Sequence, residues 1–205
     1  MASDQREALE SVHSEVRRCT KCPLHRGRTN AVPGAGPIDA DIMFIGEAPG
    51  FHEDQQGIPF VGRAGQFLNE LLEQADIDRN NVFITNVIKC RPPGNRDPKP
   101  DEVKACKPYL DEQIEILQPK VIVTLGRHSM ARAFPNEKIS QVHGQPRRVN
   151  GQIYFPMYHP AAALHQPSLT GTVQDDFAKL RSLLNGDVMV EDYEPPPEVE
   201  QLSLF

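Results

Sequence analysis

The chain has 205 residues, of which 39% are apolar, and a formal net charge of −6. This length supports one domain of ordinary size with short tails, and the longest apolar runs fall far short of the roughly 18 residues that a membrane span needs. No basic stretch followed by an apolar one opens the chain, so we expect a cytoplasmic protein without a secretory signal.

The negative charge is concentrated near the C-terminus. Residues 182–205 hold six acids and no Lys or Arg, whereas residues 1–181 hold 22 acids and 22 bases. The net charge therefore does not exclude nucleic acid as a partner, because basic residues still cluster locally in the neutral part of the chain. The change in composition predicts one domain over residues 1–185 and an acidic, flexible, proline-containing tail over residues 186–205.

The periodicity of apolar residues predicts strands that alternate with helices. In chain order we expect a helix at 3–18, a strand at 42–45, a helix at 64–75, a strand at 81–90, a helix at 101–117, a strand at 120–126, a short helix to about residue 134, a strand at 152–160 and a helix at about 172–184. Such alternation is typical of an open, parallel α/β sheet that helices cover on both faces.

Polar side chains follow three of the predicted strands. Glu47, Asn86 and His159 stand at or just beyond the strand ends, and Glu53 and Phe60 follow in the loop after the first strand. Ligands of open α/β sheets bind outside the carboxyl ends of the strands, so these side chains should share one cleft. Taken alone, the first of these segments is equally compatible with an ordinary connection from strand to helix.

Four cysteines indicate a metal site. They are Cys19, Cys22, Cys90 and Cys106, of which the first two have the C-x-x-C spacing of metal ligands. A disulfide framework is not expected in a cytosolic chain of this size. The cysteines therefore predict one site with four thiolates, and the spacing leaves zinc and an iron–sulfur cluster both open.

Three segments carry specific motifs: GEAPGFHEDQQGIPFVGRAGQFL, TNVIKCRPPGNRDPKPDE and YHPAA. Together with the order of the four cysteines, they resemble the family 4 uracil-DNA glycosylases, the iron–sulfur-containing branch of the uracil-DNA glycosylase superfamily. The resemblance runs from about residue 19 to residue 184. It implies a three-layer α/β/α sandwich with a central four-stranded parallel sheet, and a [4Fe–4S] cluster on the four cysteines that serves a structural role.

The resemblance also implies a reaction. The enzyme would flip uracil out of single- or double-stranded DNA and hydrolyse its N-glycosidic bond, which leaves an abasic site for base excision repair. Phe60 would stack on the flipped base, although it is also suited to an ordinary core. The amide of Asn86 would donate to uracil O4 and accept from N3–H, a pattern that cytosine reverses. His159 would donate to O2 as negative charge develops there.

The carboxylates and the main chain complete the expected site. We expect Glu53 to position the attacking water and to stabilise the oxocarbenium-like sugar. We expect Glu47 to form the pocket wall near uracil C5, where the methyl group of thymine must be excluded. Main-chain groups of Gly46, Glu47 and Ala48 would contact the base. The chain departs from the family pattern at His143 and His165, where family members often have arginine, so phosphate contacts would differ there.

Two other functions compete with this interpretation. One is the related branch that binds uracil and traps the abasic sugar covalently through a histidine in a basic insertion, but no histidine lies between Asn86 and Cys106. The other is a non-catalytic DNA-binding module that carries an iron–sulfur cluster. The joint presence of Glu47, Glu53, Asn86 and His159 argues against it. We expect a monomer.

The last five residues form a separate motif. Gln201, Leu202, Ser203, Leu204 and Phe205 end an otherwise acidic tail with apolar groups. This QLSLF sequence resembles the short peptides by which bacterial DNA polymerases and repair proteins bind the replication sliding clamp. The resemblance implies that Gln201 hydrogen-bonds at a small pocket while Leu204 and Phe205 fill an apolar one. The alternatives are that the segment packs on its own domain or occurs by chance.

Overall fold

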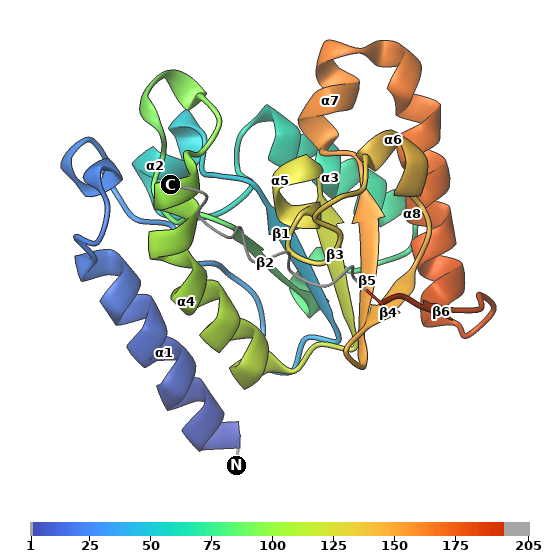
Figure 1. Cartoon of the computed structure of the whole chain (residues 1–205), viewed down its shortest axis with the longest axis horizontal. Coiled ribbons are helices and arrows are strands. Elements are labelled where there is room, and N and C mark those ends of the chain that lie inside the picture. Colours follow the sequence, from blue (N-terminus) through green and yellow to red (C-terminus); the bar gives the residue numbers. More distant parts are fainter. Residues whose placement is uncertain (1, 195–205) are drawn as a thin grey trace, which may run out of the picture.

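A mixed β-sheet with helices against both faces organises the chain (Figure 1). The structure is a computed structural model in which residues 2–194 are described. Its strands are β1 (Ile42–Gly46), β2 (Val82–Asn86), β3 (Val121–Leu125), β4 (Arg147–Val149), β5 (Gln152–Met157) and β6 (Glu191–Asp192). Its α-helices are α1 (Ala2–Arg18), α2 (Phe51–Gln56), α3 (Arg63–Gln74), α4 (Pro100–Leu117), α5 (Arg127–Met130), α6 (Ile139–Val142), α7 (Pro160–His165) and α8 (Thr170–Leu184). No helix among these residues is long and apolar enough to cross a membrane.

The sheet has six strands within the described residues, in the order β2-β1-β3-β5-β4-β6. The α/β class is confirmed, but the expectation of four strands is wrong. The four expected strands are present and mutually parallel. The addition is β4, which runs antiparallel to β5 through a turn at Asn150 and Gly151, both at positive φ. Asn-Gly between two strands is the usual signal for such a hairpin, and β6 then pairs with β4.

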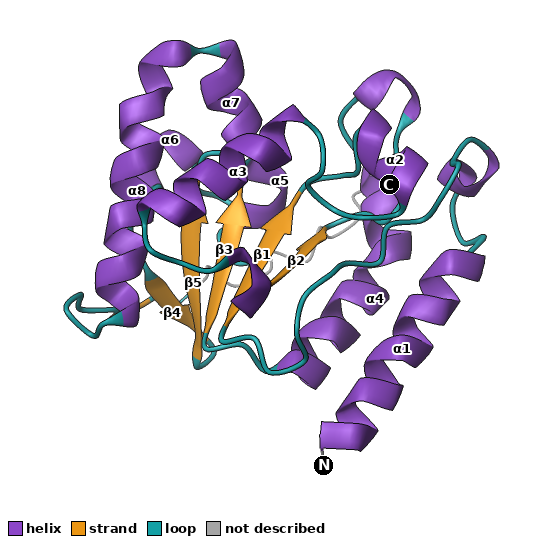
Figure 2. Cartoon of the chain, turned by 180° about the vertical axis from the view of Figure 1, so that it is seen from behind, coloured by secondary structure: helices purple, strands orange, loops and turns teal. Residues whose placement is uncertain are grey.

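The four central strands are buried on both faces, as their uninterrupted apolar sequences require. Along β1, Met43 and Ile45 face the core shared with α1 and α4, whereas Ile42 and Phe44 face the core shared with α3 and α8. Figure 2 shows these two helix pairs on either side of the strands, with α1 alongside α4. The strand ends that carry the candidate residues are thus fixed by two independent cores.

Strand β2 ends at Asn86, so the expectation of a strand to residue 90 is wrong in its second half. Beyond Asn86 the chain turns away, and the N–H groups of Val87 and Ile88 donate to the carbonyls of Gly46 and Glu47. The amine of Lys89 lies buried beneath this turn, where it donates to the Asn86 carbonyl at 2.9 Å and to Gln113, Oε1, at 2.7 Å. The apolar residues after Asn86 therefore serve a packed turn rather than a longer strand.

The first residues of the acidic tail pack against the domain. Glu191 and Asp192 form β6 beside Arg147 and Arg148 of β4, and the ring of Tyr193 contacts the ring of Phe134 and the guanidinium of Arg147. The separation of a tail at residue 186 stays a prediction, and the QLSLF segment lies outside the described residues.

Phe60 adopts a backbone conformation that bulky residues rarely take, with φ at 54°. Such a conformation is costly and persists only where its surroundings impose it. Gly65 in α3 provides one such constraint, because a Cβ there would overlap the Phe60 carbonyl and lie 2.7 Å from its Cα. The first turn of α3 thus packs directly on the backbone that places the Phe60 ring.

We predict that Gly65→Ala lowers the free energy of unfolding by about 2–3 kcal/mol, because the added methyl must displace backbone. The matched control is Gly171→Ala in α8, where nothing lies within 4 Å of a new Cβ and alanine favours the helix by about 0.5–1 kcal/mol. Denaturant titration of both variants measures the difference. Equal stabilities for the two variants would contradict the proposed constraint on Phe60.

Candidate functional site

The candidate site begins where β1 and β2 end side by side. Gly46 and Asn86 are register partners across the two strands. A Cβ on Gly46 would lie 2.7 Å from Cζ of Phe60 and closer still to Oδ1 of Asn86. Only glycine therefore allows the amide and the aromatic ring to approach the same point of backbone.

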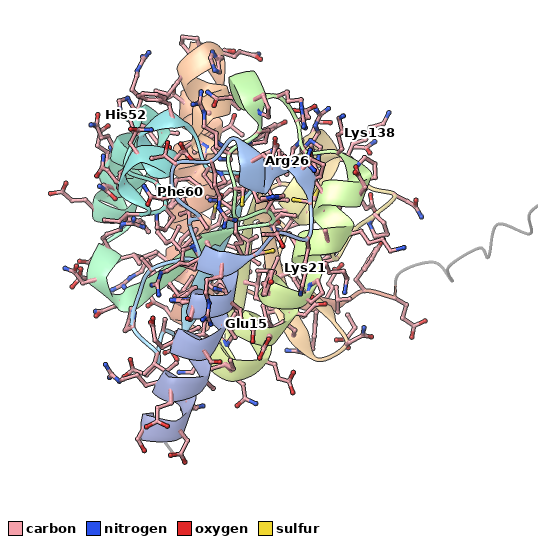
Figure 3. All side chains as sticks on the ribbon, turned by 90° about the vertical axis from the view of Figure 1, so that its left-hand side faces the viewer. Glu15, Lys21, Arg26, His52, Phe60 and Lys138 are labelled. Carbon is pink, nitrogen blue, oxygen red and sulfur yellow. The ribbon has the colours of Figure 1, made fainter. Side chains whose placement is uncertain are left out.

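A cleft of about 620 Å³ opens at this edge of the sheet. Its size is that of a small-molecule pocket. The side chains that the sequence predicted for the site line it together: Glu47, Ala48, Glu53, Phe60, Asn86 and His159. Gly46 is buried immediately behind them. Figure 3 shows Phe60 and His52 on the segment that follows β1.

The Asn86 amide is poised for a ligand. The residue is 1% exposed, and its Oδ1 atom has no hydrogen-bond partner in the described structure. A buried amide oxygen without a partner costs free energy, so such groups are uncommon unless a ligand or water satisfies them. Its alternative role, a strand-end amide satisfied by backbone, would require a partner at this oxygen.

His159 acts as the N-cap of α7 and thereby acquires a defined tautomer. Its Nδ1 atom accepts from the N–H of Ala161 at 3.1 Å, so the ring proton is placed on Nε2. Burial lowers the pKa of His159 to about 4, and the negative charge of Glu53 opposes this effect. The ring is therefore a neutral donor at Nε2 at physiological pH. It stacks near Phe60, with ring centroids 5.5 Å apart.

The Glu53 carboxylate is held by backbone. Its Oε1 atom accepts from the N–H groups of Val61 at 3.0 Å and Gly62 at 2.7 Å. Charge-assisted bonds of this kind fix the position of a carboxylate. Glu53 also influences the pKa of His159, which places its charge within electrostatic range of that ring.

Glu47 belongs to a different set of charges. Its Oε2 atom lies 3.6 Å from Nε2 of His128, and Asp97 joins the set through His128 and an ion pair with Arg127. Burial raises the pKa of Glu47; His128 opposes the rise and Asp97 adds to it. Glu47, Asp97 and His128 form the one group within residues 2–194 whose ligand atoms lie close enough for a single metal ion. Arg127 already pairs with this group, so we interpret it as an ion-pair network.

The four cysteines line one narrow cavity between the end of α1, the turn after β2 and α4. All are free thiols. Three sulfurs accept hydrogen bonds: Cys19 from the N–H of Lys21, Cys106 from the N–H of Lys89, and Cys90 from the guanidinium of Arg28 at 3.1 Å. Donors to sulfur are characteristic of metal-bound thiolates.

The spacing of the sulfurs bears on which metal they suit. No three of them lie within 4.8 Å of one another among the described residues. Four thiolates around a single zinc ion would stand about 3.8 Å apart, given Zn–S bonds of about 2.3 Å. In a four-iron cluster each thiolate binds a different iron, which requires a wider arrangement. Four thiol side chains that line one cavity match the ligand set of a [4Fe–4S] cluster, which is four thiolates.

The cleft also has walls that the sequence interpretation did not assign. They come from α2, the start of α3, the turn before α4 and the start of α7: Phe51, His52, Arg63, Pro92, Asn95, Arg96 and Ala161. Their residue types carry no local signal for a site. Only the clustering of Arg and Pro after β2 hinted at a functional loop, since surface loops beside strand ends often bear binding groups.

Comparisons with known proteins agree with one another. The family model of the Uracil DNA glycosylase superfamily matches residues 33–184. The chain is 49% identical over 189 residues to a type-4 uracil-DNA glycosylase of Sulfurisphaera tokodaii, which covers 86% of this chain and 85% of the relative. It is 47% identical to the type-4 enzyme of Saccharolobus solfataricus, over 90% of each chain. The corresponding figure for the type-4 enzyme of Thermotoga maritima is 45%, over 87% of this chain and 95% of the relative.

The environment of His159 generates a prediction about its titration. We expect the imidazole to stay neutral, with its proton on Nε2, from neutral pH until the pH approaches about 4. Removing the nearby charge in Glu53→Gln should lower the pKa further, because that carboxylate favours the protonated ring. Heteronuclear NMR of the ring nitrogens, assigned with His159→Asn, measures both. A midpoint near 6.5 or a proton on Nδ1 would contradict the geometry.

Proposed function

Because the chain belongs to the uracil DNA glycosylase superfamily, as a type-4 uracil-DNA glycosylase, we propose that the cleft at the strand ends is its uracil pocket. The protein is an N-glycosylase that acts on uracil-containing DNA in base excision repair. The observation that best supports this location is the buried Asn86 amide oxygen, which has no partner among residues 2–194 and stands beside an aromatic ring.

Two side chains would recognise the base. Uracil would stack on Phe60, which also contributes to the core beneath it, and a stack of this kind is worth about 1–3 kcal/mol. Asn86 would accept from N3–H and donate to O4. Cytosine offers the opposite donors and acceptors, so it would leave both amide groups unpaired in a buried site.

His159 would assist the breaking of the bond. As the N-glycosidic bond lengthens, negative charge accumulates on the leaving base, and the Nε2–H group would donate to O2. A donor that stays neutral stabilises this charge without adding a proton. The hydrogen bond from Ala161 would hold the ring in this tautomer throughout the reaction.

Glu53 would stabilise the sugar cation and position the attacking water. Its support is twofold: two backbone N–H groups hold one oxygen, and its charge acts on the ring of His159. Glu47 would line the wall near uracil C5, with its carboxylate turned toward His128. Main-chain groups of Gly46, Glu47 and Ala48 would contact the base, on a backbone fixed by the turn after Asn86.

The two carboxylates are distinguished by conservative variants. We predict that Glu53→Gln lowers the single-turnover rate of uracil release by about 100-fold or more, the usual size of such a contribution. Glu47→Gln should lower it by less than about tenfold. The assay is a labelled oligonucleotide with one uracil, followed by alkaline cleavage of the abasic product, and DNA affinity serves as the control. If Glu47→Gln lowers the rate more than Glu53→Gln does, the roles proposed for the two carboxylates are exchanged. A wild-type protein that releases no uracil would overturn the proposed glycosylase function.

We propose further that Cys19, Cys22, Cys90 and Cys106 hold a [4Fe–4S] cluster. Bound there, it would supply a structural link between α1, the turn after β2 and α4. The support is the shared cavity and the donors to three sulfurs.

Protein purified without oxygen should contain about four irons per chain and absorb broadly in the visible range. Cys106→Ser should reduce the iron content and the thermal stability together, because the cluster and the fold share this helix. Elemental analysis with acid-labile sulfide measures the outcome. One zinc and no iron per chain would refute the cluster.

We also propose that Gln201, Leu202, Ser203, Leu204 and Phe205 bind a bacterial sliding clamp. These residues lie outside those that the structure describes, so the support is their sequence alone. Because Tyr193 packs on the domain, the connection to Gln201 is residues 194–200, which could span at most about 25 Å if extended. Titrating a labelled peptide of residues 190–205 against a clamp decides the matter, with a peptide changed to Ala at 204 and 205 as control. Binding that is absent, or equal for both peptides, would refute it.

A further inference from the structure

A large aromatic side chain stands exposed at the rim of the cleft. Phe51 opens α2 and is 51% exposed, although most large apolar side chains in the described structure are buried. It lines the same cleft as Phe60 and lies two residues from Glu53. The cleft thus has one ring at its floor and a second at its mouth.

The ring of Phe51 is held by the adjacent His52 and by Arg91 from another segment. The guanidinium carbon of Arg91 lies 5.1 Å from the ring centroid, and Nε of Arg91 donates to Oδ1 of Asn95 at 2.7 Å. The ring of His52 meets it edge-on, with centroids 5.4 Å apart. Half of the Phe51 side chain stays accessible despite these contacts, so the ring is oriented without being covered.

The positive charge of Arg91 is also available to bind an anion. Within residues 2–194 it forms no ion pair with a carboxylate, whereas the neighbouring Arg96 pairs with Glu102 at 2.6 Å. A cation packed on an aromatic ring gains from the contact and can still bind an anion at its edge. An exposed ring beside an uncompensated guanidinium is the usual combination for a nucleotide in single-stranded nucleic acid, where the base stacks and the phosphate meets the cation.

We propose that Phe51 and Arg91 form a stacking platform for the nucleobase that adjoins the flipped uracil in single-stranded DNA. This inference rests on the proposed uracil pocket. Flipping a nucleotide deprives its neighbours of a stacking partner, and a ring at the mouth of the pocket replaces that partner. In a duplex, pairing and stacking on the other strand already hold the neighbouring base, so the platform contributes more to single strands.

The test is a thermodynamic cycle between the protein and the DNA. Fluorescence anisotropy measures the affinity of a single-stranded oligonucleotide whose uracil carries a 2′-fluoro sugar that resists cleavage. A second oligonucleotide lacks the base next to uracil, on one side or the other. Phe51→Ala should weaken binding of the first oligonucleotide about tenfold, whereas Phe51→Trp should retain it. On the oligonucleotide that lacks the stacked base, wild type and Phe51→Ala should bind equally.

Two controls make the result specific. Met189→Ala removes another exposed apolar side chain, which is 90% accessible and does not line the cleft, and should bind like wild type. Thermal unfolding shows whether each variant is folded. Equal affinities of folded Phe51→Ala and wild type for the first oligonucleotide would overturn the platform. This binding assay needs no turnover. Failure of the wild-type protein to release uracil would overturn the proposed function, whereas the platform is decided by the affinities alone.

Discussion

The candidate site depends on one close approach of backbone, at Gly46. This residue pairs with Asn86 across two buried strands, and the absence of a side chain lets the amide and the Phe60 ring meet there. The strands are rigid because two separate cores fix their faces. Phe60 in turn is held at positive φ by its contact with Gly65. A pocket that must distinguish two bases by hydrogen bonds needs groups fixed to this degree.

The segment after β2 joins the pocket to the cysteine cavity. Asn86 ends the strand, Lys89 secures its carbonyl from below, Cys90 lines the cavity and Arg91 packs on Phe51. Six consecutive positions therefore serve the base, the fold, the proposed cluster and the proposed platform. A cluster bound at the cysteines would stiffen this segment from one side while the paired strands hold it from the other. This arrangement would give the proposed cluster a direct influence on the geometry of the site.

Much of the fold and the site follows from local sequence patterns. The four parallel strands were predicted because continuous apolar runs bounded by turns have few other solutions, and the residues at their ends then share a cleft by topology. The hairpin of β4 and β5 was not predicted, although Asn150 and Gly151 have the residue types of a two-residue turn, because β4 is only three residues long and begins with two arginines.

Other features depend on contacts that no local pattern encodes. After β2 ends at Asn86, the N–H groups of Val87 and Ile88 donate to the carbonyls of Gly46 and Glu47 at the end of β1, which is distant in sequence. The tautomer of His159 follows from its place as a helix cap, and one partner of Phe51 comes from a distant segment. The sequence predicted which polar side chains lie at the strand ends. Tertiary contacts decide how each group is oriented and charged.

The central proposal is that the Asn86 amide recognises uracil in this pocket by hydrogen bonds. The most direct measurement is the single-turnover release of uracil and of cytosine from otherwise identical single-stranded oligonucleotides by wild type and Asn86→Asp. The account predicts that the variant loses about 100-fold or more of its rate on uracil, because a carboxylate cannot donate to O4, while its preference for uracil over cytosine shrinks. Unchanged release of uracil by a folded Asn86→Asp would remove this residue from recognition and contradict the account.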